Sequence, residues 1–251
     1  MSINKQIIMK TRPVGMPKLE NFEIIENEIP EIRNGEVLIK ILWLSLDPYM
    51  RGRMSTAKSY AASLHEGDVI VGGAVGSVIK SESKEYKEGD IVEGFTLGWQ
   101  EYAIATPATI RKIDPNLAPI QTAVGVLGMP GMTAFFGLLH VGKPIPGDTV
   151  VVSAASGAVG QLVGQIAKIA GCYVIGIAGG KEKCNFLLNT LNFDAAIDYK
   201  NENVDDMLDK YCPKGVNVYF DNVGGNITDS VINKLANYAR VAVCGVISQY
   251  N

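Results

Sequence analysis

Short apolar runs separated by glycine turns fill the stretch from Glu36 to Thr106. The runs are EVLIKILWLSL, GDVIVGGAVGSVI, EGDIVEGF and WQEYAIAT. Runs of this length, bounded by turn residues, are typical of β-strands. Gly67-Asp68 and Gly89-Asp90 stand where a turn leads into the next strand. The pattern predicts an all-β domain, a partly open barrel, in this part of the chain.

The spacing of apolar residues changes after Pro119. The segment QTAVGVLGMPGMTAFFGLL has helical spacing, interrupted by Gly128, Pro130 and Gly131. It predicts two short helices or one broken helix.

Strand-like and helix-like segments alternate from Thr149 onward. The expected strands are TVVVSA, YVIGIAG, AAIDY, VNVYFDNV and RVAVCGV, and the expected helices are GAVGQLVGQIAKIAG, KEKCNFLLNTLNF, NVDDMLDKY and NITDSVINKLANYA. This alternation predicts a doubly wound α/β sheet of parallel strands. We therefore expect two domains, residues 1–120 and residues 121–251. A dinucleotide-binding sheet usually has six strands and five are expected here, so the chain is either truncated before the last strand or naturally lacks it.

Composition narrows the possible functions. Of the 251 residues, 47% are hydrophobic and 20% charged, and the formal net charge is −3. These values indicate a soluble globular protein, and the lack of a basic run argues against nucleic acid or a membrane surface as partner. We find neither a signal peptide nor an apolar span, so we expect a cytoplasmic protein. No metal site is expected, because the first 171 residues hold no cysteine and only two histidines.

A glycine-containing loop follows the first strand of the doubly wound sheet. In SAASGAVG, Ala155 takes the first glycine position of a dinucleotide-binding loop, Gly157 the second and Gly160 the third. Gly157 lets the backbone approach a pyrophosphate, Gly160 lets helix and strand pack closely, and the free N–H groups at the helix start attract the anion. We expect this loop to bind a dinucleotide rather than to be a purely structural turn. Its expected cofactor-binding residues are Ala155, Ser156, Gly157, Ala158, Val159 and Gly160.

The position that distinguishes NADP from NAD follows the second strand. Ala178-Gly179-Gly180 stands there without a carboxylate, and Lys181 and Lys183 come next. Two lysines favour a 2′-phosphate, so NADP is the preferred cofactor. Glu182, between them, could instead accept from a ribose hydroxyl, and all three side chains could simply form a solvated helical turn.

Five strings carry a family resemblance that covers essentially the whole chain. They are LDPYMRGRM, GMPGMTAFFGL, AASGAVGQLVGQIAK, YFDNVGG and CGVISQYN. The chain resembles the zinc-independent medium-chain dehydrogenase/reductases, and among them the NADP-dependent double-bond reductases that include prostaglandin, alkenal and curcumin reductases. The resemblance implies a GroES-like β-barrel domain, a Rossmann domain and an active site between them. It also implies that the C-terminal segment, which completes the sheet and helps to form the dimer, is missing, so a homodimer is expected for the full-length form.

The resemblance assigns cofactor contacts to residues after the second and third strands. Lys183 matches the lysine that holds the adenosine 2′-phosphate, and Tyr199 matches a tyrosine beside that phosphate. Tyr199 could also be a half-buried strand residue. Gly179 is expected at the same site.

Further contacts are expected near the nicotinamide. Asn222 matches an asparagine near the nicotinamide ribose, and Met132 and Thr133 match the segment that lines the ring. Asn222 could instead be a turn residue, and Met132 could fill the core. Cys244 and Gly245 are expected to contact the cofactor as well.

The chemistry implied by the resemblance is hydride transfer to the β-carbon of an enal or enone. The carbonyl oxygen then gains charge, and a positioned hydroxyl can stabilise it. We expect Tyr250 to be this donor and Tyr49 to face the substrate. A tyrosine of pKa about 10 donates hydrogen bonds better than protons, so the final proton can come from water. Arg51, like His65 and His140, is expected to be structural, Arg51 through a salt bridge.

Two alternatives stay open at this stage. Related metal-independent enzymes reduce quinones on the same scaffold, so the chain could be an NADPH-dependent quinone reductase. It could also be a truncated protein that binds NADPH without turnover, since a sheet without its closing strand exposes an edge and apolar surface.

Overall fold

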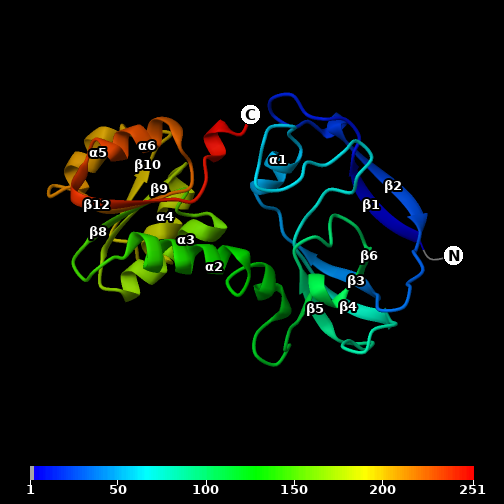
Figure 1. Cartoon of the computed structure of the whole chain (residues 1–251). Helices are drawn as coiled ribbons and strands as arrows, with labels where there is room; N and C mark the ends of the chain where they lie inside the picture. The colour runs from blue at the N-terminus through cyan, green and yellow to red at the C-terminus, as the bar shows by residue number, and fades with distance from the viewer. Residues whose placement is uncertain (1–2) are drawn as a thin grey trace. The chain divides into compact units, whose positions relative to one another are not determined.

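The computed structural model of the chain describes residues 3–251. Its elements fall into two compact units (Figure 1). The first unit runs to Gly125 and also includes Tyr250–Asn251, and the second is Val126–Gln249.

The first unit contains a five-stranded antiparallel sheet in the order β6-β3-β4-β5-β7. Its strands are β3 (Val37–Leu44), β4 (Ala74–Ser81), β5 (Ile91–Gly94), β6 (Tyr102–Ala105) and β7 (Arg111–Lys112). Val37, Ile39, Val78 and Val92 are buried together in its core. Because β6 and β7 form the two edges of this order, the sheet is open, as the glycine-punctuated apolar runs predict.

A separate two-stranded sheet was not expected from the sequence. It pairs β1 (Ile3–Met9) with β2 (Phe22–Glu28) in antiparallel register. Both strands carry many polar residues, so neither shows the apolar pattern that marks a strand. The remaining elements of this unit are α1 (Tyr49–Arg53), η1 (Leu19–Asn21), η2 (Pro107–Thr109) and η3 (Ile120–Val124).

The second unit is built on a five-stranded sheet in the order β10-β9-β8-β11-β12, and every pair is parallel. The strands are β8 (Thr149–Ser153), β9 (Tyr173–Ala178), β10 (Ala195–Asp198), β11 (Val216–Asp221) and β12 (Leu235–Val243). The helices between them are α3 (Ala158–Ile169), α4 (Lys181–Asn189), α5 (Val204–Tyr211) and α6 (Gly225–Ile232). Counted from β8, the order is that of a dinucleotide-binding sheet, which confirms the predicted doubly wound fold.

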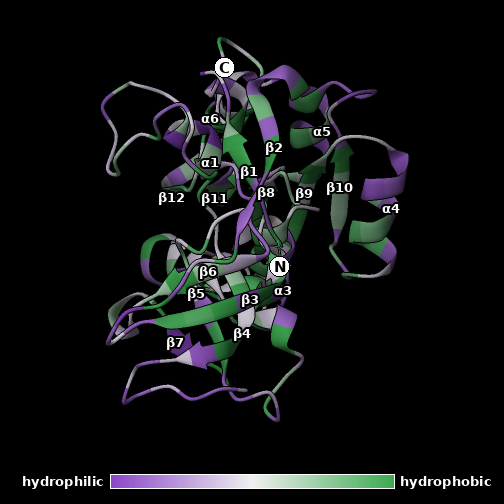
Figure 2. Ribbon diagram, turned by 90° about the vertical axis from the view of Figure 1, so that its right-hand side faces the viewer, coloured by the Kyte–Doolittle hydropathy of each residue, from purple (hydrophilic) through white to green (hydrophobic). Residues whose placement is uncertain are grey.

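Both faces of this sheet are buried. Val150 and Val152 belong to a core cluster that includes Val163 of α3. Val151, which points to the opposite face, belongs to a second cluster with Leu208 of α5. Strands buried on both faces consist of nearly continuous apolar residues, and Figure 2 shows β9 and β10 mainly in the colour of hydrophobic residues.

The helical segment before this sheet begins with α2 (Met129–Phe136) and continues into a π-helical turn, η4 (Gly137–Gly142). The chain approaches itself closely here, since a Cβ on Gly131 would lie 1.8 Å from the carbonyl oxygen of Val126. Only glycine fits that position without moving the backbone.

The prediction of a helix over residues 226–239 is wrong in its second half. Helix α6 ends at Ile232, and β12 already begins at Leu235, which pairs with Val216 of β11. The next pair joins Val218 to Arg240, so the register shifts between the two pairs, and Tyr238 in the intervening part of β12 adopts a left-handed φ of 62°. Strand pairing outweighs the helical spacing in this segment. Among the helices of residues 3–251, none has both the length and the apolar character needed to cross a bilayer.

Candidate functional site

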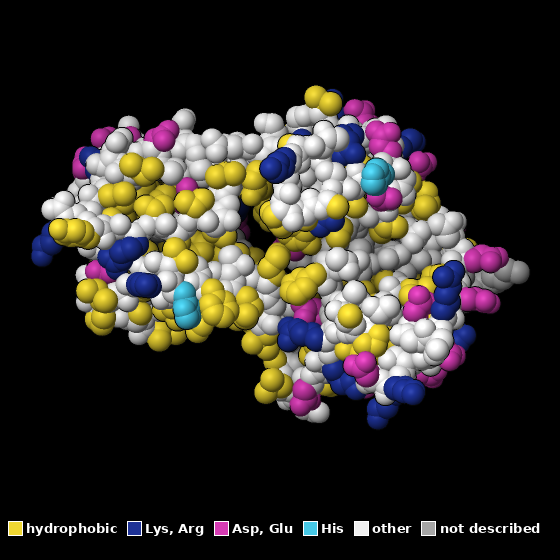
Figure 3. All heavy atoms as spheres, viewed as in Figure 1, with side chains coloured by type: hydrophobic (Ala, Val, Ile, Leu, Met, Phe, Trp, Pro, Cys, Tyr) yellow, Lys and Arg dark blue, Asp and Glu magenta, His cyan; other side chains and the backbone are white. Residues whose placement is uncertain are grey.

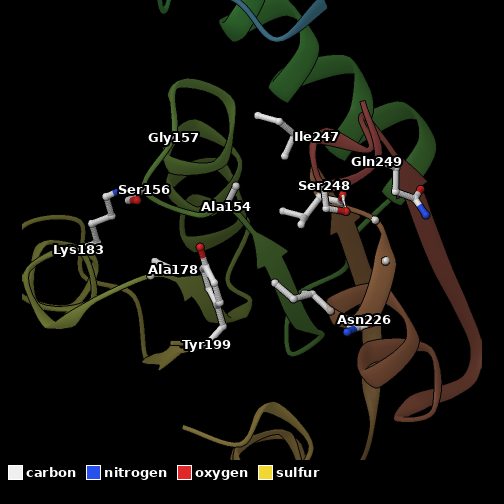
Figure 4. A pocket seen from close by; sticks show the side chains of 15 residues that line it. Ala154, Ser156, Gly157, Ala178, Lys183, Tyr199, Asn226, Ile247, Ser248 and Gln249 are labelled. Carbon is white, nitrogen blue, oxygen red and sulfur yellow. Dashed lines mark hydrogen bonds between the residues drawn. The ribbon is translucent and has the colours of Figure 1, made fainter. Parts of the chain in front are cut away.

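A cavity of about 690 Å³ opens at the carboxyl ends of β8, β9 and β11 in the second unit (Figure 4). This edge is where ligands bind in open parallel sheets, and the volume is that of a small-molecule site. Its lining residues are Ala154, Ser156, Gly157, Ala178, Gly179, Lys183, Tyr199, Val223, Gly224, Gly225, Asn226, Ile227, Ile247, Ser248 and Gln249.

The loop between β8 and α3 forms one wall of the cavity. Gly157 is the N-cap residue of α3 and has no side chain to cap it, so the first N–H groups of the helix remain available to an anion. Gly160 lies beneath the loop, where a Cβ would come within 2.4 Å of the carbonyl oxygen of Ala154. Ala155 is fully buried. Ser156 and Gly157 therefore face the cavity, and Ala155 and Gly160 support them from below.

The turn after β9 forms the adjoining wall. Gly179, Lys183 and Tyr199 line the cavity together, although Tyr199 follows a different strand, β10. The ring of Tyr199 lies against Gly179, where a Cβ would approach its atoms to 2.8–2.9 Å. In Figure 4, Ser156, Lys183 and Tyr199 lie on one side of the pocket. Four predicted cofactor residues, Ser156, Gly179, Lys183 and Tyr199, thus line one part of the cavity.

The opposite side is formed by two turns that lie within the strings YFDNVGG and CGVISQYN but whose residues were not predicted as cofactor contacts. One is Val223–Gly225 after β11, and the other is η5 (Ile247–Gln249) after β12. The hydroxyl of Ser248 donates to the carbonyl oxygen of Val223 at 2.6 Å, which joins the two turns. Gly224 has a φ of 73° and Gly225 a φ of 59°. The Gly-Gly pair that follows a buried strand after two intervening residues is the signal that could have identified the first turn.

A buried carboxylate shapes the turn after β11. Asp221 is 2% exposed. Its Oδ1 accepts from Tyr219 Oη at 2.9 Å, from Ser153 Oγ at 3.2 Å and from the Val223 and Gly224 N–H groups at 2.9 and 3.0 Å. Its Oδ2 accepts from the hydroxyl of Thr228 at 2.6 Å. The hydrogen bonds from the N–H groups of Val223 and Gly224 to Asp221 fix the turn that faces the cavity.

The hydrogen bonds to Asp221 also set its charge. Burial opposes ionisation, but the hydrogen bonds from Thr228, Gly224 and Val223 outweigh it and lower the pKa of the Asp221 carboxyl. Burial raises the pKa of Tyr219, which therefore keeps its proton and donates. The network is consequently anionic at neutral pH and fully supplied with donors.

Several predicted cofactor residues do not line the cavity. Asn222 ties β11 to β8, because its N–H donates to Ser153 Oγ at 2.9 Å and its side-chain amide donates to the Ser153 carbonyl at 2.8 Å. The N–H groups of Cys244 and Gly245 donate to the carbonyl oxygen of Asp221 at 2.8 and 3.1 Å. These residues therefore brace the strand ends behind the turns.

Met132 and Thr133 lie on α2, outside the cavity lining. Met132 is 56% exposed, next to Phe135 and Phe136, which are also exposed. Hydrophobic side chains gather over this part of the second unit in Figure 3. Ala158 and Val159, in the first turn of α3, are likewise not lining residues.

The two tyrosines expected to act on the substrate, Tyr49 and Tyr250, belong to the first unit. Tyr49 begins α1, and burial together with the nearby charge of Asp47 raises its pKa. The salt bridge expected for Arg51 does not occur in the described part of the chain. Arg51 instead donates from Nε to Asn251 Oδ1 at 2.8 Å and from a terminal nitrogen to the Gly15 carbonyl at 2.9 Å.

Neither histidine lies in the cavity lining. His65 has Nδ1 3.4 Å from Asp68 Oδ2, and His140 packs near the rings of Phe135 and Phe136. Within residues 3–251, no three His, Cys, Asp or Glu side chains gather in a way that could hold a metal ion.

Comparison with known proteins connects this geometry to a family. Residues 5–113 match the family described as the N-terminal domain of oxidoreductase, and residues 158–251 match the family described as zinc-binding dehydrogenase. An NADPH-dependent curcumin reductase of Escherichia coli is 44% identical over 248 residues, which cover 99% of this chain and 72% of that protein. A 2-alkenal reductase (NADP(+)-dependent) of Nicotiana tabacum is 48% identical over 255 residues, which cover 99% of this chain and 74% of the relative.

Solved structures agree with these matches. CurA from Vibrio vulnificus in complex with NADPH is 48% identical, with a TM-score of 0.94 over 98% of this chain and 73% of that one. An Escherichia coli quinone oxidoreductase is 20% identical with a TM-score of 0.72 over 92% of this chain and 70% of that one, so it shares the fold alone. The parallel sheet and the pocket at its carboxyl edge agree with these matches. The sequence identity shows that the chain belongs to the NADP-dependent double-bond reductases of the medium-chain dehydrogenase/reductase family.

Proposed function

We propose that the chain uses NADPH to reduce the carbon–carbon double bond of α,β-unsaturated aldehydes and ketones. The observation that carries the proposal is the composition of the cavity in the second unit. Among the described residues that line it, Lys183 is the only charged one. Relatives with names such as curcumin reductase and 2-alkenal reductase support the choice of reaction.

The lining residues fit a phosphorylated dinucleotide. The uncapped start of α3 at Gly157 offers N–H groups to a diphosphate. Lys183 offers a cation to a 2′-phosphate, and no carboxylate among the lining residues competes for it. We propose that Ser156 and Tyr199 contact the same end of the nucleotide, because they share that side of the pocket (Figure 4).

The other predicted contacts are proposed in a supporting role. Asn222, Cys244 and Gly245 hold the strand ends on which the lining turns rest. Replacing these residues would therefore change ligand binding indirectly, by displacing the turns at Val223–Gly225 and at η5. Met132 and Thr133 are proposed to contact the nicotinamide end, on the family resemblance.

Bound NADPH supplies the hydride in this reaction. We propose that the hydroxyl of Tyr250 donates a hydrogen bond to the substrate carbonyl oxygen as that oxygen gains charge. Tyr49 is proposed to contact the substrate as a neutral phenol, because burial and the charge of Asp47 raise its pKa. A neutral phenol can donate to the substrate without adding a charge to the site.

The test is NADPH oxidation with a panel of substrates, followed by product analysis. A medium-chain 2-alkenal should yield the saturated aldehyde, and the saturated aldehyde itself should not be consumed. A simple quinone serves as the competing substrate, and NADH serves as the competing cofactor. Turnover of the quinone alone, or consumption of the saturated aldehyde, would contradict the proposed reaction.

We also propose, on the family resemblance, that the full-length protein is a homodimer, and we propose that it is cytoplasmic, as expected from the sequence. Light scattering on the purified full-length protein measures its mass directly. The mass of a monomer at micromolar concentrations would contradict the assembly and leave the proposed chemistry untouched.

A further inference from the structure

Asp198 ends β10 with a side chain directed at the turn that follows the neighbouring strand. It is 7% exposed. Its Oδ1 accepts from the Gly180 N–H at 2.7 Å and from the Lys200 N–H at 3.2 Å. Its Oδ2 accepts from the side-chain amide of Asn201 at 2.7 Å. The carboxylate is therefore occupied by donors from this chain.

The turn that Asp198 holds determines where α4 begins. Gly180 is the N-cap residue of α4 and has a φ of 99°. Because glycine has no side chain to hold it in this conformation, the position of Gly180 depends on the groups that bind its backbone. The Gly180 carbonyl accepts from the N–H of Cys184 at 3.2 Å, which closes the first turn of the helix around Lys183.

The next residue of the chain acts on the same turn. The ring of Tyr199 lies against Gly179, close enough that a Cβ there would meet the ring at 2.8–2.9 Å. Two consecutive residues, Asp198 and Tyr199, thus hold two consecutive glycines. One holds its glycine by a hydrogen bond and the other by packing. Lys183 belongs to the helical turn that this arrangement orients.

We infer that Asp198 is a positioning residue for selectivity between NADPH and NADH, acting through the Gly180 N–H on the turn that carries Lys183. The inference rests on the proposed function, because it requires Lys183 to bind a 2′-phosphate. A carboxylate at the end of β9 would ordinarily accept from a ribose 2′-hydroxyl and favour NAD. The carboxylate of Asp198 instead ends the neighbouring β10 and accepts from backbone N–H groups and Asn201, so it serves the opposite preference.

The hydrogen bonds to Asp198 also leave it little tendency to be protonated. The side-chain amide of Asn201 and the N–H of Gly180 lower the pKa of its carboxyl. The carboxylate is therefore ionised at neutral pH and accepts from Gly180 there. In contrast, the N–H groups proposed to bind the diphosphate belong to the start of α3, a different helix.

Calorimetric titration with 2′,5′-ADP and with 5′-AMP tests the inference without any catalytic turnover. Asp198→Ala should weaken binding of 2′,5′-ADP by roughly five- to tenfold, the worth of about one hydrogen bond, and leave binding of 5′-AMP nearly unchanged. Asp198→Asn should retain most of the affinity, because its amide oxygen can still accept from Gly180 while the Asn201 amide turns to present its own oxygen.

Asp206→Ala is the matched control for charge. Asp206 is exposed on α5 and its loss removes one negative charge from the same unit. It should leave the ratio of the two affinities unchanged. If all three variants bind 2′,5′-ADP more tightly than the wild type, the loss of a negative charge explains the effect. Asp198 then acts only by repelling the phosphates of the ligand, and the inference is overturned.

The remaining outcomes separate the inference from the proposed function. An unchanged affinity ratio in Asp198→Ala, or equal losses for both nucleotides, would overturn the positioning role while leaving the NADPH proposal intact. A wild-type protein that binds both nucleotides equally would overturn the use of a 2′-phosphate site, and the inference with it.

Discussion

Replacing Asp221 with alanine should lower the free energy of unfolding of the second unit by about 4 kcal/mol. The variant removes the acceptor of five hydrogen bonds from a site that is 2% exposed. The hydroxyls of Ser153, Tyr219 and Thr228 can rotate toward other acceptors. The N–H groups of Val223 and Gly224 cannot, and an unsatisfied buried donor costs about 1–3 kcal/mol.

Asp221→Asn should be milder, with a loss of about 1–2 kcal/mol. Its amide oxygen can take the place of Oδ1 and keep four of the donors. Its amide nitrogen would face the Thr228 hydroxyl, which can accept from it and turn its own hydrogen toward Tyr219 Oη, 3.2 Å away. The hydrogen bonds lose the assistance of the charge, but the neutral amide is less costly to bury.

Urea titration followed by circular dichroism measures both variants. Helices α2 to α6 all lie in the second unit, so the helical signal reports that unit. Fluorescence serves as the internal control, because Trp43 and Trp99 both belong to the first unit. A loss below 1 kcal/mol for the alanine variant, or equal losses for the two variants, would refute the argument from unsatisfied donors.

The same comparison has a defined pH dependence. Because the folded-state pKa of Asp221 is lowered, ionisation stabilises the native state above the unfolded-state pKa of about 4. The stability difference between the wild type and Asp221→Asn should be constant at neutral pH. It should shrink as the pH falls below about 4, through the folded-state pKa. A difference that grows in acid would contradict the assigned ionisation.

Four further predictions concern the cavity, the chemistry and the thiols. Lys183→Ala should weaken NADPH binding roughly tenfold at low salt and leave NADH unaffected, and fluorescence titration at two ionic strengths would reveal equal losses if Lys183 binds no phosphate. Tyr250→Phe should lower kcat more than it changes the affinity for NADPH, and steady-state kinetics with unchanged kcat would remove Tyr250 from the mechanism. Gly160→Ala should cost about 1–3 kcal/mol and weaken NADPH binding, whereas Gly164→Ala, which collides with the buried Phe193 ring instead, should cost stability and spare the affinity. Burial raises the pKa of all four thiols, that of Cys212 to about 11, but only Cys244 is exposed, so a thiol reagent at pH near 8 should label one site in the native protein and all four in denaturant.

Much of the fold could be predicted because its apolar pattern is local. The runs around Val150, Ile175 and Val218 mark strands buried on both faces, and the amphipathic segments between them mark the crossover helices. The pairing of β1 with β2 could not be predicted, since their polar residues hide the strand pattern. The start of β12 at Leu235 depends on its pairing with Val216, which is a tertiary contact.

The site was predictable where a single turn makes it. The loop at Gly157 and the segment carrying Lys183 follow directly from strand, glycine and helix in order. The turn at Gly224 and the segment at Ser248 reach the cavity only because β11 and β12 lie beside β8, a neighbourhood set by the sheet order. The role of Asp198 was hidden for the same reason, because its partner Gly180 follows a different strand.

The central place of β8 in the sheet has a consequence for motion. The chain leaves β8 toward β9 and β10 on one side, and returns to form β11 and β12 on the other. The lining residues come from both sides, with Lys183 from one and Gly224 from the other. A molecule seated there would bridge the two halves of the sheet, so amide hydrogen exchange should slow in both halves at once when the nucleotide is added.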